Sequence, residues 1–371
     1  MKPRCLFVLT YYPEFLDALY AREPGVSELG YESHLEHLLD TGFGVGDAYC
    51  RGLRKLGCEA SVVIVNADRL QARWAIEHDV QTHGNIHDRR RQILAAQVSK
   101  DRPDVLYVFE WCPLGDAFLA QIKAQVGLLV GQIASPLPSN RTFTAYDLMI
   151  SAWPPIVDHF RSKGIACEPL RLGFDPLALE RISPEPPLYD VTFVGGFAPS
   201  HDDRIPWLEH LLQELDVTIF GYGLERVPSA SPIHNHYRGP AWGWEMYEAI
   251  QRSKITLNRH AIIEVGSPRD SCCAANMRLY EATGVGTCLV TDAKENLSEM
   301  FEPTREVVTY TDARDCVEKV QHYLTHKSER EAVAAAGRRR TMRDHTYDSR
   351  MCELLDFLVR YLPAGRKTLS R

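Results

Sequence analysis

The stretch NMRLYEATGVGTCLVTD, residues 276–292, constrains the fold of this chain more than any other. Asn276 is a favourable N-cap residue, Met277–Thr283 is a run of helix formers, and Gly284 is expected to end the helix. The apolar run Thr287–Val290 that follows predicts a buried strand of a parallel sheet. A helix and strand in this order indicate an α/β fold. The start of such a helix stabilises a phosphate through unpaired N–H groups and the helix dipole.

Arg278 and Glu281 lie three residues apart in this predicted helix, and therefore on one face of it. A cation and a carboxylate placed in this way can bind one ligand together, the carboxylate accepting a hydrogen bond from a hydroxyl. The alternative is an ordinary ion pair on the surface of a helix, which is common. These residues alone do not decide between the two, so the rest of the chain has to.

Length and composition indicate a soluble protein of two domains. A chain of 371 residues exceeds what one hydrophobic core usually organises. Its hydrophobic content of 45% and charged content of 25% are typical of globular proteins. The net charge is −7, and no basic block with interleaved aromatic residues occurs, so a nucleic-acid partner is not expected.

The sequence predicts a cytoplasmic protein without a permanent metal or cofactor. The apolar run near the amino terminus is too short for a signal peptide, and none approaches the ~18 residues that span a membrane. Peripheral contact with a membrane stays open. The ten cysteines are mostly single, with no Cys-x-x-Cys pair and no zinc-type spacing, which fits a reducing compartment.

The first half of the chain begins with a strand, a glycine loop, a helix and a second strand. These are predicted at Leu6–Thr10, at the run GFGVG of residues 42–46, at Asp47–Leu56 and at Ala60–Val65. The glycines do not have the spacing of the dinucleotide fingerprint and do not directly follow the strand. A dehydrogenase is therefore the least favoured class.

Two further features of the first half suggest functional groups. Glu110 directly follows the predicted strand Val105–Phe109, at the end of the strand where ligands bind in open parallel sheets, and is a candidate catalytic carboxylate. A loop acid without a task is the alternative. Tyr11, Phe15 and neighbouring aromatic residues are expected either to offer stacking surfaces to a ligand or simply to pack.

The second half restarts the α/β pattern after a proline-rich segment. The strand Val191–Val194 runs directly into Gly195 and Gly196, so backbone N–H groups could approach a phosphate there. His201 and Arg204 follow at a distance that suits charge neutralisation. These features favour a nucleotide site in the second half of the chain.

The predicted fold class is α/β, with two Rossmann-like parallel-sheet domains facing across a cleft and a C-terminal helix packing back on the N-terminal domain. The expected divisions are an N-terminal domain 1–174, a linker 175–188, a C-terminal domain 189–345 and a returning helix 346–371. Such a cleft suits an activated donor held by one domain and an acceptor held by the other.

Several segments carry a resemblance to a known family. The segments VGG…HDDR, KITLNRH and NMRLYEATGVGTCLVTD resemble the C-terminal domain of CgeB-like glycosyltransferases, relatives of the large retaining group with the two-domain GT-B fold. YYPEFL, LQARWAIEH, GQIASPLP and LGFDP extend the resemblance to the first half. It implies metal-independent transfer of a hexose-type sugar, with retention, from a UDP-, GDP- or dTDP-linked donor to a hydroxyl acceptor. The acceptor is a glycan, a lipid, a protein or a metabolite.

The resemblance also assigns roles to residues. Glu281 matches the glutamate that accepts hydrogen bonds from the donor ribose, and Arg278 lies in the helix start that meets the diphosphate. The residues implied in donor binding are Gly195, Gly196, His201, Tyr222, Arg238, Gly239, Asn258, Asn276, Met277, Arg278 and Glu281. The candidate catalytic residues are Glu110, Arg204 and Arg278.

The chain departs from the superfamily at one position. Cys273 stands where relatives have a second glutamate, eight residues before Glu281, which leaves Asp270 or Glu264 as alternatives for contacting the sugar. Other classes also stay open, namely a nucleotide-sugar epimerase of the same architecture and a non-enzymatic coat or assembly protein. A solute-binding protein is disfavoured because an export signal would be expected.

Overall fold

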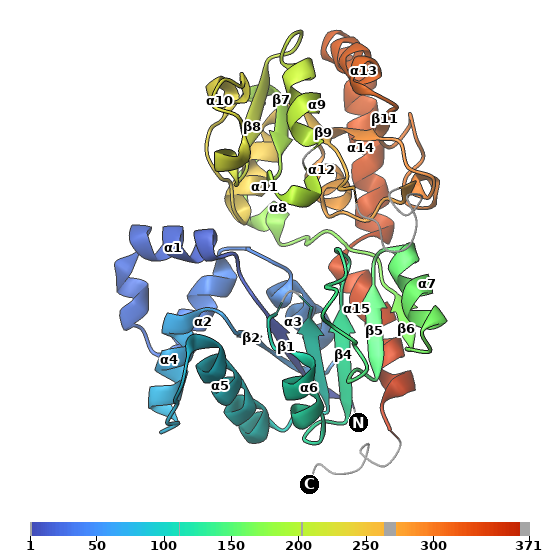
Figure 1. The fold of residues 1–371 in the computed structure, drawn as a ribbon. Coiled ribbons are helices and arrows are strands. Elements are labelled where there is room, and N and C mark those ends of the chain that lie inside the picture. The colour runs from blue at the N-terminus through green and yellow to red at the C-terminus, as the bar shows by residue number, and fades with distance from the viewer. Residues whose placement is uncertain (1, 111, 202, 263–271, 364–371) are drawn as a thin grey trace. The chain divides into compact units, whose positions relative to one another are not determined.

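A computed structural model describes residues 2–110, 112–201, 203–262 and 272–363 (Figure 1). The chain divides into two compact units, Met1–Arg171 together with Arg350–Arg371, and Leu172–Ser349. Each unit is built on one parallel sheet with helices on its faces. The predicted α/β class with two parallel sheets is thus confirmed.

The first unit contains a six-stranded sheet in the order β2-β1-β3-β4-β5-β6. Its central strands are continuous apolar runs because helices cover both faces of a parallel sheet. The strands are β1 (Arg4–Leu9), β2 (Glu59–Ile64), β3 (Val105–Phe109), β4 (Leu128–Gln132), β5 (Leu148–Ser151) and β6 (Cys167–Pro169). The helices are α1 (Pro13–Arg22), α2 (Tyr31–Asp40), α3 (Gly46–Lys55), α4 (Asp68–Glu77), α5 (Ile86–Asp101), α6 (Asp116–Lys123) and α7 (Pro154–Ser162).

Packing explains the glycine loop and the aromatic run of the first unit. A Cβ atom on Gly46 would lie 2.5 Å from Leu9 Cδ2, so this glycine lets α3 approach β1 closely. Phe15 stacks on Phe43 with ring centroids 4.2 Å apart, and Tyr11 is buried beside them. These aromatic side chains therefore pack, as the second interpretation predicted, whereas Tyr12 is exposed.

The second unit contains a five-stranded sheet in the order β11-β10-β9-β7-β8. A separate apolar cluster lies on each face of the sheet, one including Trp207 and the other Phe174. The strands are β7 (Tyr189–Val194), β8 (Val217–Phe220), β9 (Ser253–Asn258), β10 (Cys288–Asp292) and β11 (Val308–Tyr310). The helices are α8 (Ala178–Arg181), α9 (Arg204–Leu211), α10 (Ile233–His236), α11 (Trp244–Gln251), α12 (Arg278–Val285), α13 (Ala313–Thr325) and α14 (Lys327–Asp344).

Two predictions about the ends of α12 are wrong. Met277, not Asn276, occupies the N-cap position without a capping side chain, because the Asn276 amide donates to Asn258 instead. Gly284 lies inside the helix, and Gly286 ends it with a φ of 86°, a left-handed conformation that favours glycine. Gly284 is needed for packing, since a Cβ atom there would lie 2.3 Å from the ring of Phe174.

The last helix, α15 (Tyr347–Tyr361), begins in the second unit and ends in the first. Its end is held by Glu168, whose Oε1 accepts hydrogen bonds from Arg360 Nη1 and from the Tyr361 hydroxyl, both at 3.0 Å. The segment expected to be a linker contains α8, and Ala178 of this helix is buried in the apolar cluster of Phe174. Among the described helices, none is long and apolar enough to cross a membrane.

Candidate functional site

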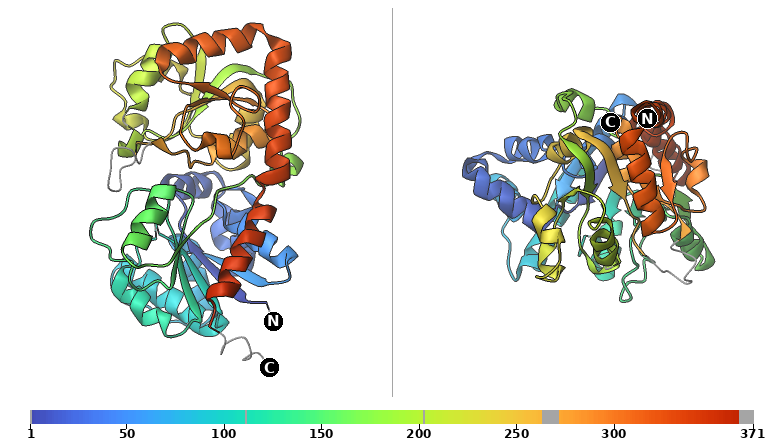
Figure 2. Two further views of the ribbon diagram at one scale, coloured as in Figure 1. Left: turned by 90° about the vertical axis from the view of Figure 1, so that its right-hand side faces the viewer. Right: turned by 90° about the horizontal axis from the view of Figure 1, so that it is seen from above.

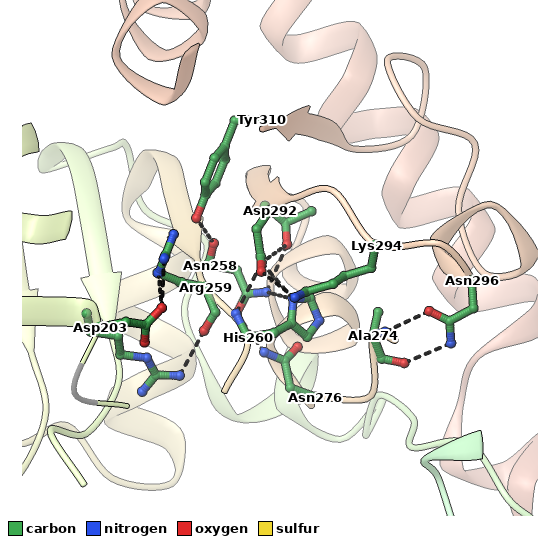
Figure 3. A network of polar contacts seen from close by, with 12 residues as sticks. Asp203, Asn258, Arg259, His260, Ala274, Asn276, Asp292, Lys294, Asn296 and Tyr310 are labelled. Atoms are coloured by element: carbon green, nitrogen blue, oxygen red, sulfur yellow. Dashed lines mark hydrogen bonds and ion pairs between the residues drawn. The ribbon is translucent and has the colours of Figure 1, made fainter. Parts of the chain in front are cut away.

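Polar residues gather at the carboxyl edge of the second sheet. Asn258 ends β9, Asp292 ends β10, and Gly195 directly follows β7. Because the three strands are parallel neighbours, their ends meet at one edge, where open α/β sheets bind ligands. Asn276, just before α12, reaches the same edge by its hydrogen bond to Asn258 (Figure 3).

Arg278 and Glu281 form a buried ion pair rather than a surface pair. Arg278 Nη1 lies 2.8 Å from Glu281 Oε2, and their side chains are only 12% and 5% exposed. Burial raises the pKa of Glu281, and the charge of Arg278 opposes this shift. Arg278 Nη2 also donates to the Val194 carbonyl at 3.1 Å, but its buried Nε has no hydrogen-bond partner in the described structure. A buried guanidinium with an unpaired N–H is costly unless water or a ligand satisfies it.

Arg204 holds the turn that follows β7 in place by hydrogen bonds to backbone carbonyl groups. Its Nη1 donates to the Gly196 carbonyl at 2.8 Å and its Nη2 to the Arg259 carbonyl at 2.9 Å. Burial lowers the pKa of this guanidinium to about 10, although Asp203 opposes the shift, so the group stays charged near neutral pH. Its Nε is buried without a partner among residues that the structure describes.

The glycine turn is fixed by neighbouring loops. The Gly195 N–H donates to the Phe220 carbonyl at 2.9 Å, so this group does not point to a phosphate as the sequence suggested. A Cβ atom on Gly221 would lie 2.0 Å from the Gly195 oxygen, and one on Gly196 would lie 2.4 Å from Tyr222 Cζ. The glycines therefore let the ends of β7 and β8 approach each other.

Tyr222, Arg238 and Gly239, which the resemblance implies in donor binding, lie close to this turn. Tyr222 stacks on Trp242 with ring centroids 5.5 Å apart, and the Gly239 carbonyl accepts the Gly221 N–H at 3.1 Å. The backbone N–H of Arg238 donates to the end of β8 at Ile219. These residues belong to the second unit, as do His201 at the end of a short 3₁₀ turn and Met277 at the start of α12.

Sequence reasoning missed the pair formed by His260 and Asp292. His260 Nδ1 lies 2.7 Å from Asp292 Oδ1, and its backbone N–H donates to the same oxygen at 3.1 Å (Figure 3). Burial alone would raise the pKa of Asp292. The hydrogen bonds and charge of His260, with Lys294, outweigh burial and hold that pKa well below its usual range. The position of His260 two residues after β9, in the segment KITLNRH, is the signal that could have found it.

Glu110 lies in the first unit, in a buried charge network. Arg141 Nη1 lies 2.8 Å from Glu110 Oε2, and the Tyr146 hydroxyl donates to Oε1. Arg141 also binds Asp116 at 2.7 Å. Burial raises the pKa of Glu110 to about 7, and Arg141 opposes the shift without cancelling it. These contacts give Glu110 a structural role, and a catalytic role stays a prediction.

The raised pKa of Glu110 predicts a pH-dependent stability of the first unit. Between its usual value of 4.5 and about 7 the folded chain binds more protons at Glu110 than the unfolded chain does. The contribution of Glu110 is therefore greatest below pH 4.5 and is lost as the pH rises through 7, by at most about 3 kcal/mol. We expect Glu110→Gln to remove this dependence in hydrogen exchange of β3 amides at pH 5 and pH 8.

Glu59→Gln is the matched control, since Glu59 is 74% exposed in its pair with Arg4. This variant should keep the pH dependence of the natural chain. An equal difference in stability between the natural chain and Glu110→Gln at both pH values would contradict the prediction.

Of the remaining predicted groups, Cys273 is half-buried, whereas Glu264 and Asp270 lie outside the described residues.

One described group could hold a metal, namely His322, His326 and Glu329, whose ligand atoms lie within 4.8 Å of one another. It is exposed, at the sharp corner where α13 meets α14 (Figure 2). His322 lies on α13 and Glu329 on α14, whereas the polar groups at the edge of the sheet lie at the ends of β7, β9 and β10 and at the start of α12.

Comparisons with known proteins agree with this geometry. Residues 204–356 match a family model described as glycosyl transferase-like. A glycosyltransferase from Rickettsia africae ESF-5 superposes with a TM-score of 0.60 over 98% of this chain and 100% of its own, at 10% identity. The chain has a GT-B fold. This GT-B chain is also similar to Anabaena Alr3699/HepE in complex with UDP-glucose, with a TM-score of 0.60, 10% identity and coverage of 96% and 99%.

A third GT-B neighbour is the sucrose-phosphate synthase of Thermosynechococcus elongatus, with a TM-score of 0.53, 10% identity and coverage of 96% and 98%. No curated protein sequence matches the chain. The family match spans Arg204, Arg278 and Glu281, so the buried cations and the carboxylate lie within the glycosyltransferase-like part of the chain.

Proposed function

We propose that this chain is a glycosyltransferase of the CgeB-like type that moves a sugar from a nucleoside diphosphate sugar to a hydroxyl acceptor. The observation that carries the proposal is the set of buried polar groups without partners, within the described structure, at one edge of the second sheet. Arg204 Nε, Arg278 Nε and His260 Nε2 all belong to it. Buried polar groups are nearly always hydrogen-bonded to protein, to ordered water or to a ligand, and a polar ligand at this edge would satisfy all three. The UDP-glucose complex of a GT-B neighbour supports a nucleotide sugar as that ligand.

In this proposal the two arginines supply positive charge where the leaving diphosphate gains negative charge. Arg278, at the first residue of α12, binds the diphosphate together with the helix start, and its partner Glu281 accepts from the ribose. Arg204 holds the turn after β7 in place. The acceptor oxygen bonds to the anomeric carbon as the bond from that carbon to the diphosphate oxygen breaks, and the acceptor proton is released. Retention, a hexosyl donor and independence of metal belong to the proposal through the resemblance.

A thermal-shift screen tests the proposal directly. UDP, GDP, dTDP and CDP, each alone and as its sugar conjugate, would be added to the purified chain. We expect one base to stabilise it by about 2.7 kcal/mol at 100 times its dissociation constant. The control variant Arg305→Ala removes an arginine of the same unit that is 73% exposed. The nucleotide should raise its unfolding temperature by as much as that of the natural chain.

Two results would count against the proposal. The absence of a shift with every nucleotide would contradict a nucleotide site. Formation of an isomeric nucleotide sugar without any acceptor would instead indicate an epimerase. Incubation of the selected donor with candidate acceptors, followed by mass spectrometry, separates hydrolysis from transfer.

A further inference from the structure

The His260 side chain is held in one orientation and ends in an unused nitrogen. The residue is 5% exposed, and its Nδ1 lies against the carboxylate of Asp292 at 2.7 Å. An ionised carboxylate only accepts hydrogen bonds, so Nδ1 carries a proton and donates. At a pH where the imidazole is neutral, Nε2 is then an acceptor. It is buried, and no described residue donates to it.

The same carboxylate sets the direction of a chain of hydrogen bonds that ends at Asn276. The Thr291 hydroxyl donates to Asp292 Oδ1 at 3.4 Å, and therefore accepts from Asn258 Nδ2 at 2.9 Å. Asn258 Oδ1 in turn accepts from Asn276 Nδ2 at 2.8 Å. This order leaves Asn276 Oδ1 as an acceptor, and that atom is also buried without a donor in the described part of the chain.

His260 and Asn276 flank the same amide. Asn258 Nδ2 lies 3.4 Å from His260 Nδ1, while Asn258 Oδ1 binds Asn276 (Figure 3). The site thus offers two neighbouring buried acceptors beside the cations Arg204 and Arg278. A diphosphate has no hydrogen to donate to acceptors, whereas a sugar ring carries several hydroxyl groups.

We propose that His260 Nε2 and Asn276 Oδ1 accept hydrogen bonds from ring hydroxyls of the transferred sugar. The inference rests on the proposed function, and it adds that these two residues bind the sugar of the donor. It also supplies the sugar contacts left unassigned by the cysteine at position 273. A polar site rejects a substrate that lacks the matching hydroxyl, because the buried acceptor then stays unpaired.

Two substitutions of His260 separate the two ring nitrogens. His260→Asn places an amide nitrogen near Nδ1, so it keeps a donor for Asp292 but removes the acceptor. His260→Gln places an amide oxygen near Nε2 and should restore part of the binding. The matched control is His236→Asn, which alters another histidine–aspartate pair of the same unit, 3.2 Å from Asp216.

The measurement compares each nucleotide with its sugar conjugate by calorimetry. The pairs are UDP with UDP-glucose, GDP with GDP-mannose and dTDP with dTDP-glucose. The pair that raises the unfolding temperature of the natural chain is used. We expect His260→Asn and Asn276→Ala each to weaken binding of the sugar conjugate about tenfold and that of the nucleotide by less than about twofold. In a series of donors that each lack one ring hydroxyl, the donor without the hydroxyl that binds Nε2 should bind equally to His260→Asn and to the natural chain.

Equal weakening of nucleotide and conjugate would overturn the inference, since the ribose or the diphosphate would then be the contact. Unchanged binding of the conjugate by His260→Asn would overturn it as well, while leaving the proposed function intact. If the natural chain binds none of the nucleotides and sugar conjugates of the thermal-shift screen, the proposed function fails first. Unfolding temperatures without ligand show whether each variant is folded.

Discussion

The variant Arg278→Ala is expected to lose donor turnover, with kcat/KM falling on the order of 10²–10³-fold, as for other donors aimed at a developing negative charge. It is also expected to lower the stability of the second unit by about 3–5 kcal/mol, because Glu281 becomes a buried charge without its partner. The pair is suited to this test, since its side chains are only 12% and 5% exposed. Turnover and urea unfolding measured on one preparation give both numbers.

A double variant separates the structural role of Arg278 from its role toward the ligand. Arg278→Met with Glu281→Gln removes both charges and keeps similar volumes, which is often close to neutral for stability. We expect it to regain most of the unfolding free energy but none of the turnover. Recovery of turnover together with stability would show that Arg278 only supports the fold.

The second large effect is expected for Gly221→Ala. The added Cβ atom would lie 2.0 Å from the Gly195 oxygen and 2.9 Å from the Gly195 carbonyl carbon, and backbone atoms cannot rotate away as a side chain can. The turns after β7 and β8 must then separate, which breaks the hydrogen bond from Gly195 to Phe220. We expect a loss of more than about 3 kcal/mol and no binding of nucleotide.

Gly25→Ala is the control for this glycine prediction. A Cβ atom on Gly25 would meet no heavy atom within 4 Å, so the substitution should be nearly neutral. Thermal unfolding and calorimetry with the selected nucleotide compare the two variants. A Gly221→Ala protein that folds and binds as the natural chain does would contradict the assigned contact.

The strands of this chain were readable from the sequence, because buried parallel strands are short apolar runs. Val105–Phe109 was predicted with the observed ends, and Cys288–Asp292 was predicted one residue early at its start and two at its end. The end of α12 was not readable. Gly284 looks like a helix stop, and only the ring of Phe174, more than a hundred residues earlier, explains a glycine inside the helix.

Only part of the candidate site could be predicted from the sequence. The spacing of Arg278 and Glu281 predicted their pairing, but burial, which makes the pair significant, depends on tertiary packing. The two carbonyl groups that accept from Arg204, on Gly196 and Arg259, were not predicted, because the meeting of these loops also depends on tertiary packing. His260 was missed because its partner Asp292 lies on the neighbouring strand, and strand order cannot be read from local pattern.

The course of α15 has a consequence for how this protein is made. The first unit consists of two separate segments, Met1–Arg171 and Arg350–Arg371, with the whole second unit inserted between them. On the ribosome, therefore, the second unit emerges complete while the first still lacks its last helix. The surface that α15 covers, including its contact at Glu168, closes only after residue 350 has emerged. The unit synthesised first is thus the last to be finished.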